Sequence, residues 1–126
     1  LTKQGILCLV ATSKPEIYAK KILDYYELSN YFYYIAGANM DGTRTDKAEV
    51  IAYALKQIPA EYSNKKVLMV GDRSHDIIGA KKNGIDCAGV LFGYGSREEL
   101  EGAGADFVAD SVEAVKNIVF SDIARN

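Results

Sequence analysis

The chain has 126 residues, 15 of them basic and 17 acidic, with a formal net charge of −2. This length suits one domain that buries about two thirds of its unfolded surface, and it argues against a second folded domain. The basic and acidic residues are mixed along the sequence, so we expect no surface for nucleic acid or for an anionic membrane.

The two cysteines and the hydropathy of the chain bear on its location. Cys8 lies inside an apolar run and Cys87 lies just before another, with no second cysteine near either. This predicts buried thiols rather than a disulfide framework. No apolar stretch approaches the roughly 20 residues that span a bilayer, and the N-terminus lacks the apolar core of a signal peptide. We therefore expect a cytoplasmic protein with no membrane partner.

Short continuous apolar runs alternate with longer helical patterns along the chain. This alternation is typical of a three-layer, Rossmann-like α/β fold, in which crossover helices connect the strands of a parallel sheet. Residues 1–126 are expected to form one such core domain. Strands are predicted at residues 6–11, 32–37, 66–71 and 87–92, and a short edge strand at 106–109.

Helices are predicted between these strands. The first begins at Pro15 and stops at residues 29–30, the second is capped by Thr45 and ends before Pro59, and the third ends at a left-handed cap. Ser96 with Glu99 forms a capping-box pattern, and Ser111 marks one more helix start. The residues expected on buried helix faces include Ile22, Leu23, Tyr26, Val50, Ile51, Ala54, Ile77, Ile78, Ala80, Val112, Val115 and Val119.

Polar residues follow the ends of the first two predicted strands. The first strand closes on Thr12, Ser13 and Lys14 at a helix start, which could bind an anion or could simply cap the helix. The second strand leads into a polar loop that delivers Lys47 to the start of a helix. The helix dipole disfavours a cation there, so the position favours a functional lysine over a solvated surface lysine.

The apolar run before residue 71 ends in two acidic side chains four residues apart. Asp72 and Asp76 then lie on one side of a helix start. They could merely complement the helix dipole, but two carboxylates at the carboxyl end of a buried strand also form a half-site for Mg²⁺. Ligands of open parallel sheets bind beyond the carboxyl ends of the strands, where all these residues are expected.

A hydroxyl, a lysine and paired aspartates on three successive strand ends resemble motifs two, three and four of the haloacid dehalogenase superfamily, most closely its phosphoglycolate phosphatase branch. The resemblance implies a Mg²⁺-dependent phosphatase that acts on a small phosphorylated metabolite through an aspartyl-phosphate. By that resemblance Thr12 and Ser13 would bind the transferring phosphoryl group and Lys47 would neutralise its charge. Asp72 would bind Mg²⁺, and Asp76 would orient metal waters or Lys47.

The family begins with a strand that ends in Asp-x-Asp-Gly-Thr, and residues 1–11 contain no aspartate. Residues 39–43, Asn-Met-Asp-Gly-Thr, look similar, but an amide replaces the nucleophile and the segment lies between motifs two and three, so we interpret it as a turn. We expect two half-sheets with sticky inner edges, and a longer parent protein that supplies the missing strand and a cap domain. The chain alone would then be inactive.

Two other interpretations stay open at this stage. A response-regulator receiver of similar size uses the same residue types, although its acidic residues precede its threonine and lysine, and a truncated relative could serve only as a binding module. The roles of His75 and of the tyrosine cluster at residues 25–34 stay open as well, since solvent exposure and rim packing explain them equally well. The sequence identifies neither the substrate nor the oligomeric state.

Overall fold

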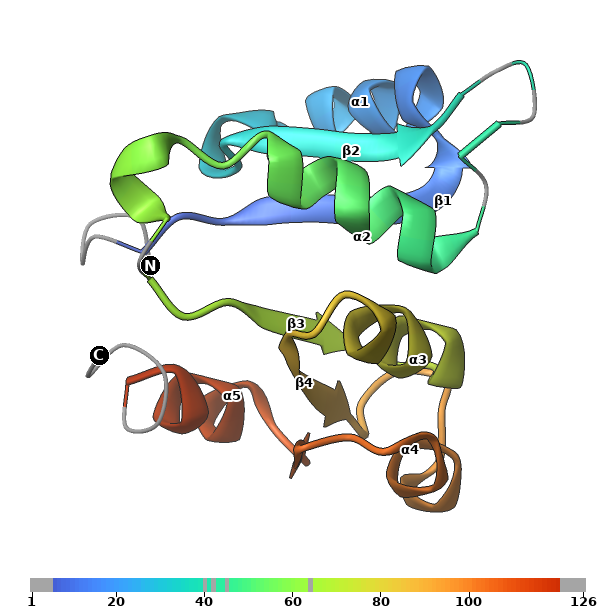
Figure 1. The fold of residues 1–126 in the computed structure, drawn as a ribbon, viewed down its shortest axis with the longest axis vertical. Coiled ribbons are helices and arrows are strands. Elements are labelled where there is room, and N and C mark those ends of the chain that lie inside the picture. Colours follow the sequence, from blue (N-terminus) through green and yellow to red (C-terminus); the bar gives the residue numbers. More distant parts are fainter. Residues whose placement is uncertain (1–5, 40, 42, 45, 64, 121–126) are drawn as a thin grey trace. The chain divides into compact units, whose positions relative to one another are not determined.

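The computed structural model describes residues 6–39, 41, 43–44, 46–63 and 65–120. The chain divides into two compact units, Leu1–Ala60 and Glu61–Asn126, and each has its own sheet. Every strand pair among the described residues is parallel, which confirms the predicted α/β class (Figure 1). The division into two sheets agrees with the expectation of two half-sheets.

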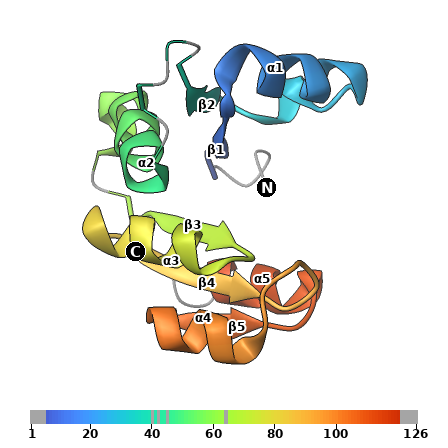
Figure 2. The same ribbon diagram turned by 90° about the vertical axis from the view of Figure 1, so that its right-hand side faces the viewer.

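The first unit is a strand–helix–strand–helix arrangement. Strands β1 (Leu9–Pro15) and β2 (Tyr34–Ala38) pair side by side, and α1 (Glu16–Tyr25) and α2 (Lys47–Lys56) flank them on opposite sides (Figure 2). A 3₁₀ helix, η2 (Ser29–Tyr31), precedes β2. The core is built from the small or branched side chains of both layers: Ala36, Val50 and Ala54, with Leu9, Ala11, Tyr34 and Tyr53 packed against them.

Strand β1 bulges where it ends. Ala11 pairs with Ala36 and Pro15 pairs with Ala38, so three residues of β1 stand where β2 has only Gly37. A Cβ atom on Gly37 would lie 2.6 Å from the Cα of Glu16, so only glycine fits there. A bulge breaks the regular alternation of a strand and redirects its side chains. Thr12 lies in this bulge.

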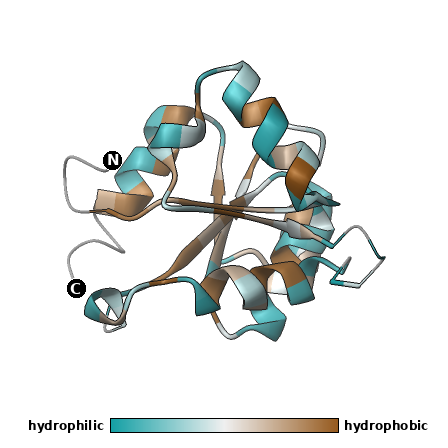
Figure 3. Cartoon of the chain, turned by 90° about the horizontal axis from the view of Figure 1, so that it is seen from above, coloured by the Kyte–Doolittle hydropathy of each residue, from teal (hydrophilic) through white to brown (hydrophobic). Residues whose placement is uncertain are grey.

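The second unit has three strands and three helices. Its sheet has the order β3 (Leu68–Gly71), β4 (Asp86–Val90), β5 (Phe107–Ala109). The helices are α3 (Ser74–Lys82), α4 (Arg97–Ala103) and α5 (Val112–Ile118), and the 3₁₀ helix η3 (Ala60–Tyr62) lies at the boundary between the units in the sequence. The core of the second unit consists of Ile77, Ala80, Cys87 and Leu100. The strands are largely apolar and the helices carry both polar and apolar residues (Figure 3).

Several predicted helix ends are confirmed and others were wrong. Ser96 and Ser111 cap α4 and α5 by accepting the N–H groups of Glu99 and Ala114. Gly84 adopts the left-handed conformation after α3, with φ 69°. The first helix, however, ends at Tyr25 rather than at residues 29–30, which form η2 instead.

The cap of α2 also differs from the prediction. Asp46 takes this position and accepts the N–H of Ala48 at 3.2 Å, and Thr45 lies outside the described residues. An aspartate one residue later caps equally well, because its carboxylate reaches the same orphan N–H groups.

The periodic patterns overstated how much of each helix is buried. Ile22 and Tyr26 of the first helical segment are 45% and 64% exposed, and only Ala19 of α1 is buried. Ile78 is 44% exposed and Val112 is 61% exposed. A periodic pattern identifies the apolar face of a helix, but it does not say whether another element covers that face.

Strands β1 and β3 are less buried than the strands they pair with. No residue of β1 or β3 is fully buried, whereas four residues of β2 and four of β4 are. Val70 of β3 is 42% exposed. Each of the two strands is an edge strand of its sheet among the described residues. None of the helices among the described residues has the length and the apolar character of a membrane span.

Candidate functional site

Thr12 and Ser13 lie at the carboxyl end of β1, in the bulge. The Thr12 hydroxyl accepts the backbone N–H of Lys14 at 3.2 Å, which fixes the turn toward α1. Ser13 is exposed. The carboxyl end of a parallel strand is where α/β proteins bind ligands, so both predicted hydroxyls lie in a position suited to a ligand.

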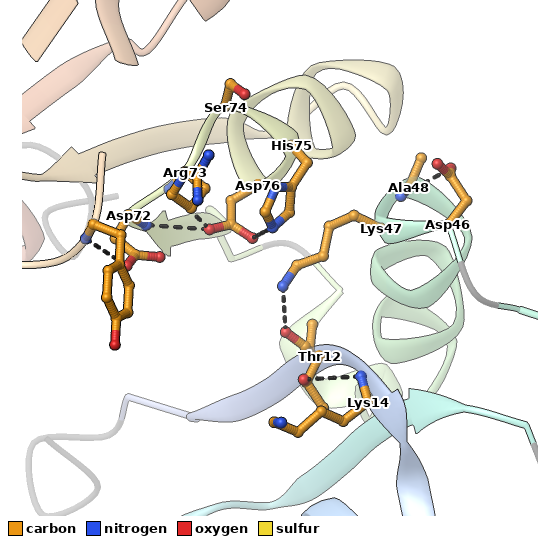
Figure 4. A network of polar contacts seen from close by, with 12 residues as sticks. Thr12, Lys14, Asp46, Lys47, Ala48, Asp72, Arg73, Ser74, His75 and Asp76 are labelled. Carbon is orange, nitrogen blue, oxygen red and sulfur yellow. Dashed lines mark hydrogen bonds and ion pairs between the residues drawn. The ribbon is translucent and has the colours of Figure 1, made fainter. Parts of the chain in front are cut away.

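Lys47 is the first residue of α2, as the sequence predicted. Its ammonium group donates to the backbone oxygen of Ala11 at 2.8 Å, so the long side chain extends to the end of β1, next to Thr12 (Figure 4). Residues 36 positions apart in the sequence therefore meet at one strand end. The Lys47 ammonium therefore lies at the strand end that carries Thr12.

The loop between β2 and α2 contains the segment that resembles the family's first motif. Within it, Asp41 accepts both the N–H and the hydroxyl of Thr43, at 3.0 and 2.7 Å. These bonds lower the pKa of Asp41 below its usual range. The carboxylate is therefore used inside its own loop, which agrees with the interpretation of the segment as a turn. Met40 and Gly42 lie outside the described residues.

Asp72 follows directly after β3, where the sheet of the second unit ends. Its Oδ2 accepts the backbone N–H of Tyr94 at 3.0 Å, from the loop after β4. The loop passes close enough that a Cβ on Gly93 would lie 2.4 Å from the Asp72 carboxylate. The backbone of a second loop thus fixes one carboxylate oxygen of Asp72.

Asp76 has a different setting from Asp72. It is only 4% exposed, and its Oδ2 accepts the backbone N–H groups of Asp72 and Arg73 at 3.1 and 3.3 Å (Figure 4). A Cβ on Gly71 would lie 2.4 Å from the Asp76 Cβ, so the turn wraps tightly around this side chain. Asp76 therefore holds the turn that presents Asp72.

Glu99 of α4 supports the same turn from the other side. One carboxylate oxygen accepts the Arg73 guanidinium at 2.9 Å and the Ser74 N–H at 2.7 Å. The pKa of Glu99 is lowered by the Arg73 bond first and by the Ser74 N–H second. The sequence pattern assigned Glu99 to a local capping box with Ser96. Its backbone N–H does bond to Ser96, but its side chain serves α3.

His75 lies between the two aspartates in the sequence. Its Nε2 is 3.8 Å from the Asp76 Oδ1, and the side chain is 59% exposed. The contact becomes an ion pair only when the imidazole is protonated. This geometry assigns no chemical role to His75.

The donor groups of the second unit fit a partly hydrated hard cation. The described residues contain no group of three or more His, Cys, Asp or Glu side chains that could hold a metal ion. Mg²⁺ does not need such a cage, because it commonly binds one or two carboxylates and takes its remaining ligands from water and phosphate. Asp72 would supply that carboxylate, and Asp76 would hold it in place from the turn.

The sequence patterns did not reveal the side-chain contacts of Glu99 or the contact of the Tyr94 amide with Asp72. These contacts join residues 22 to 26 positions apart, so no local pattern indicates them. The one available signal was the glycine on each side of Tyr94, which indicates a close backbone approach.

The comparisons with known proteins agree with these observations. Residues 1–90 match the family described as haloacid dehalogenase-like hydrolase. A 5'-nucleotidase of Pseudomonas aeruginosa is 42% identical over 102 residues, which are 79% of this chain and 44% of that protein. The tyrosine-protein kinase PtkA of Mycobacterium tuberculosis is 42% identical over 101 residues, 80% of this chain and 34% of the kinase.

More distant relatives and solved structures extend the match. A phosphoglycolate phosphatase of Vibrio parahaemolyticus is 27% identical over 119 residues, 94% of this chain and 51% of that enzyme. A crystal structure of a candidate phosphatase from Clostridium difficile has a TM-score of 0.83 and 51% identity, and the match covers 93% of this chain and 54% of that one. The chain thus spans about half, or less, of the length of these proteins.

The family match covers more than half of the chain, and the identity to the first two relatives exceeds 40% over more than two thirds of it. The matched residues 1–90 include Thr12, Lys47, Asp72 and Asp76. This chain therefore belongs to the haloacid dehalogenase-like hydrolases.

Proposed function

We propose that this chain is part of a Mg²⁺-dependent phosphomonoester phosphatase that works through an aspartyl-phosphate. The observation that carries the proposal is the Lys47 ammonium bonded at 2.8 Å to the end of β1, next to Thr12. Phosphoryl transfer is catalysed mainly by positioning and by stabilising charge on the phosphoryl oxygens. A cation and a hydroxyl at one strand end supply the two kinds of donor that this needs.

The proposal gives each of these side chains one role. Thr12 and Ser13 donate hydrogen bonds to the phosphoryl oxygens, and Lys47 neutralises their charge. Asp72 binds Mg²⁺, and Asp76 keeps the Asp72 turn in place through its two backbone bonds. When bound, Mg²⁺ would add positive charge against the phosphoryl oxygens.

We propose that an additional strand of the parent protein carries the aspartate nucleophile. The low burial of β1 and of β3, each within its own unit, supports further covering by the parent protein, because Leu- and Val-rich strands are normally covered on both faces in α/β proteins. Val70, 42% exposed, is the clearest case. On this proposal the isolated 126-residue chain has no nucleophile and no phosphatase activity.

The substrate proposed is a small phosphorylated metabolite, with selection by a cap domain of the parent protein. The phosphoglycolate phosphatase and the 5'-nucleotidase among the relatives support a small phosphomonoester. The two relatives do not favour a particular leaving group, because a 5'-nucleotidase and a phosphoglycolate phosphatase are named for different leaving groups.

The experiment uses the full-length parent protein with an aryl phosphate and Mg²⁺. Lys47→Ala and Asp72→Asn should each lower kcat/KM by at least about a hundredfold, the range of a lost charge-stabilising group. Matched controls are Lys56→Ala at the other end of α2 and Asp86→Asn at the start of β4, which should change little. Full activity in both site variants would refute the assignment, and activity in the isolated chain would refute the missing nucleophile.

A second candidate reaction follows from the 42% identity to PtkA. The same site could transfer the phosphoryl group to a tyrosine hydroxyl instead of water. Labelled phosphate would then appear on protein tyrosine rather than as inorganic phosphate. A parent protein that does neither, yet still folds, would instead support a non-catalytic binding module.

A further inference from the structure

Arg44 has an unusual backbone conformation in the loop between β2 and α2. Its φ is 53°, in the left-handed region that side chains with a Cβ rarely adopt. Such a conformation persists when surrounding contacts fix it, and it is frequent at functional sites. Its side chain is only 18% exposed, so those contacts are substantial.

The Arg44 guanidinium contacts three different elements of the first unit. Its Nε donates to the backbone oxygen of Gly37, in β2, at 2.8 Å. One terminal nitrogen lies 3.7 Å from Oε1 of Glu16, the first residue of α1. The guanidinium also lies over the ring of Tyr53 in α2, with Cζ 3.7 Å from the ring centre. A planar guanidinium suits this combination of stacking and hydrogen bonding better than an ammonium does.

Two of the groups that contact Arg44, the Glu16 carboxylate and the Tyr53 side chain, also form hydrogen bonds with residues of β2. The Glu16 carboxylate also accepts the Gly37 N–H, at 3.2 Å. The Tyr53 hydroxyl bonds to the hydroxyl of Tyr34 in β2, at 2.9 Å. That bond, with burial, raises the pKa of Tyr34 to about 12. We call these residues, Glu16, Tyr34, Gly37, Arg44 and Tyr53, the Arg44 cluster.

The Arg44 cluster joins α2 to β2 and to the first residue of α1. Arg44 precedes Lys47 by three residues, and Tyr53 lies on the same helix as Lys47. A lysine side chain has many rotamers, so the direction of its ammonium depends on how firmly its backbone is held. Contacts of the cluster therefore lie on both sides of Lys47 along the chain, at Arg44 before it and at Tyr53 after it.

We propose that Arg44 is a positioning residue that holds Lys47 at the end of β1, ready for a phosphoryl oxygen. The inference rests on the proposed function, because it gives the position of Lys47 a purpose. It assigns to Arg44 no contact with the substrate. The charge of Arg44 is already balanced by Glu16, so its contribution is geometric.

The test measures Lys47 itself, in the 126-residue chain and without any turnover. Brief acetylation followed by mass spectrometry gives the modification rate of Lys47 relative to Lys56, an exposed lysine of the same helix. Arg44→Ala and Tyr53→Leu should raise that ratio roughly fivefold, the factor that one net hydrogen bond represents. Tyr53→Phe keeps the ring under the guanidinium and should keep the ratio within about twofold of the parent chain.

Arg44→Lys separates charge from geometry. It keeps the positive charge beside Glu16 but loses the planar stack, so the Lys47 ratio should rise as it does in Arg44→Ala. If the Lys47 ratio stays unchanged in Arg44→Ala and in Tyr53→Leu, the proposal is overturned, even if both variants melt at lower temperature. If Arg44→Ala does not fold, the Lys47 ratios of Tyr53→Leu and Arg44→Lys still test the proposal.

Failure of the proposed function gives a different result. If Lys47→Ala keeps full activity in the parent protein, the proposed function fails. The acetylation ratio of Lys47 would still respond to the Arg44 variants, so the positioning itself would stand. In the parent protein, Arg44→Lys should raise KM and lower kcat together, because a displaced Lys47 weakens binding of the substrate and weakens stabilisation of the transition state by more.

Discussion

Two glycines in the loop after β4 leave no room for a methyl group beside Asp72. A Cβ on Gly93 would lie 2.4 Å from both the Cβ and the Oδ2 of Asp72, and a Cβ on Gly95 would lie 2.1 Å from the Asp72 backbone oxygen. No flexible side-chain end is available to move away, since backbone and a bonded carboxylate form the contact. The loop and the aspartate must therefore move together if either glycine changes.

We expect Gly93→Ala to lower the free energy of unfolding by about 1–3 kcal/mol, the usual cost of overpacking. It should also weaken Mg²⁺ binding by the parent protein, because the Tyr94 amide could no longer hold the Asp72 carboxylate. Thermal unfolding and metal titration measure the two effects. Gly102→Ala is the matched control, since its Cβ would meet nothing within 4 Å. In a helix this change should stabilise by about 0.5–1 kcal/mol.

Glu27 and Arg44 are the two residues other than glycine with positive φ among the described residues, at 58° and 53°. Glu27→Gly relieves the strain at an exposed position and should stabilise the chain by up to about 1 kcal/mol. Arg44→Gly relieves the same strain but removes the contacts of the guanidinium, so it should destabilise. Denaturant unfolding of both variants tests this, and equal stabilisation would show that the Arg44 cluster contributes nothing to stability.

At the scale of the element, Glu99 connects α4 to the start of α3, and this connection depends on pH. The Arg73 and Ser74 bonds hold the pKa of the folded carboxyl below its ordinary value of 4.5. The unfolded state binds the proton more readily than the folded state does. The stability that this contact contributes is therefore fully present above pH 4.5, and it is lost as the pH falls through the pKa of the folded carboxyl.

The stability difference between the wild type and Glu99→Gln should therefore be constant near neutral pH and should shrink below about pH 4.5. Melting temperatures measured from pH 7 to pH 3 give this difference directly. Glu98→Gln, at the neighbouring exposed position of the same helix, should show no comparable pH dependence. A Glu99→Gln difference that stays the same throughout would mean that the carboxylate charge is unimportant to the contact.

Most elements could be predicted from the sequence because their signals are local. Apolar runs identified all five strands in the correct order, and serines and an Asn-Gly pair identified three helix ends. The extent to which the apolar face of α1 is buried could not be predicted. Its exposed apolar residues satisfy the same helical period as a buried face, and burial depends on what the chain packs against elsewhere.

At the scale of the whole molecule, the two units have separate hydrophobic cores. Leu100 is fully buried in the second core, and Leu100→Ala should cost about 2–5 kcal/mol there. We expect hydrogen exchange to accelerate across residues 65–120, while the amides of β2 and α2 keep their protection. Uniform loss of protection across both units would contradict this expectation and would indicate a single cooperative unit.

The candidate site could be predicted only as far as its motifs reach. Thr12, Lys47, Asp72 and Asp76 follow strands or begin helices, where sequence order places them at the carboxyl edges of parallel sheets. Arg44 and the Tyr94 amide could not be found this way. They act across loops, and the distances between loops are set by tertiary packing rather than by local pattern.

The bulge in β1 shows that chain length, as well as side-chain type, contributes to the site. Between its two paired positions, Ala11 and Pro15, the strand has two residues more than the facing strand uses. A deletion of two residues there would let regular pairing continue into the next turn and would leave the apolar core unchanged. It would also remove the outward loop of backbone on which Thr12 is presented, so that a stable fold would survive without this candidate hydroxyl at the end of β1.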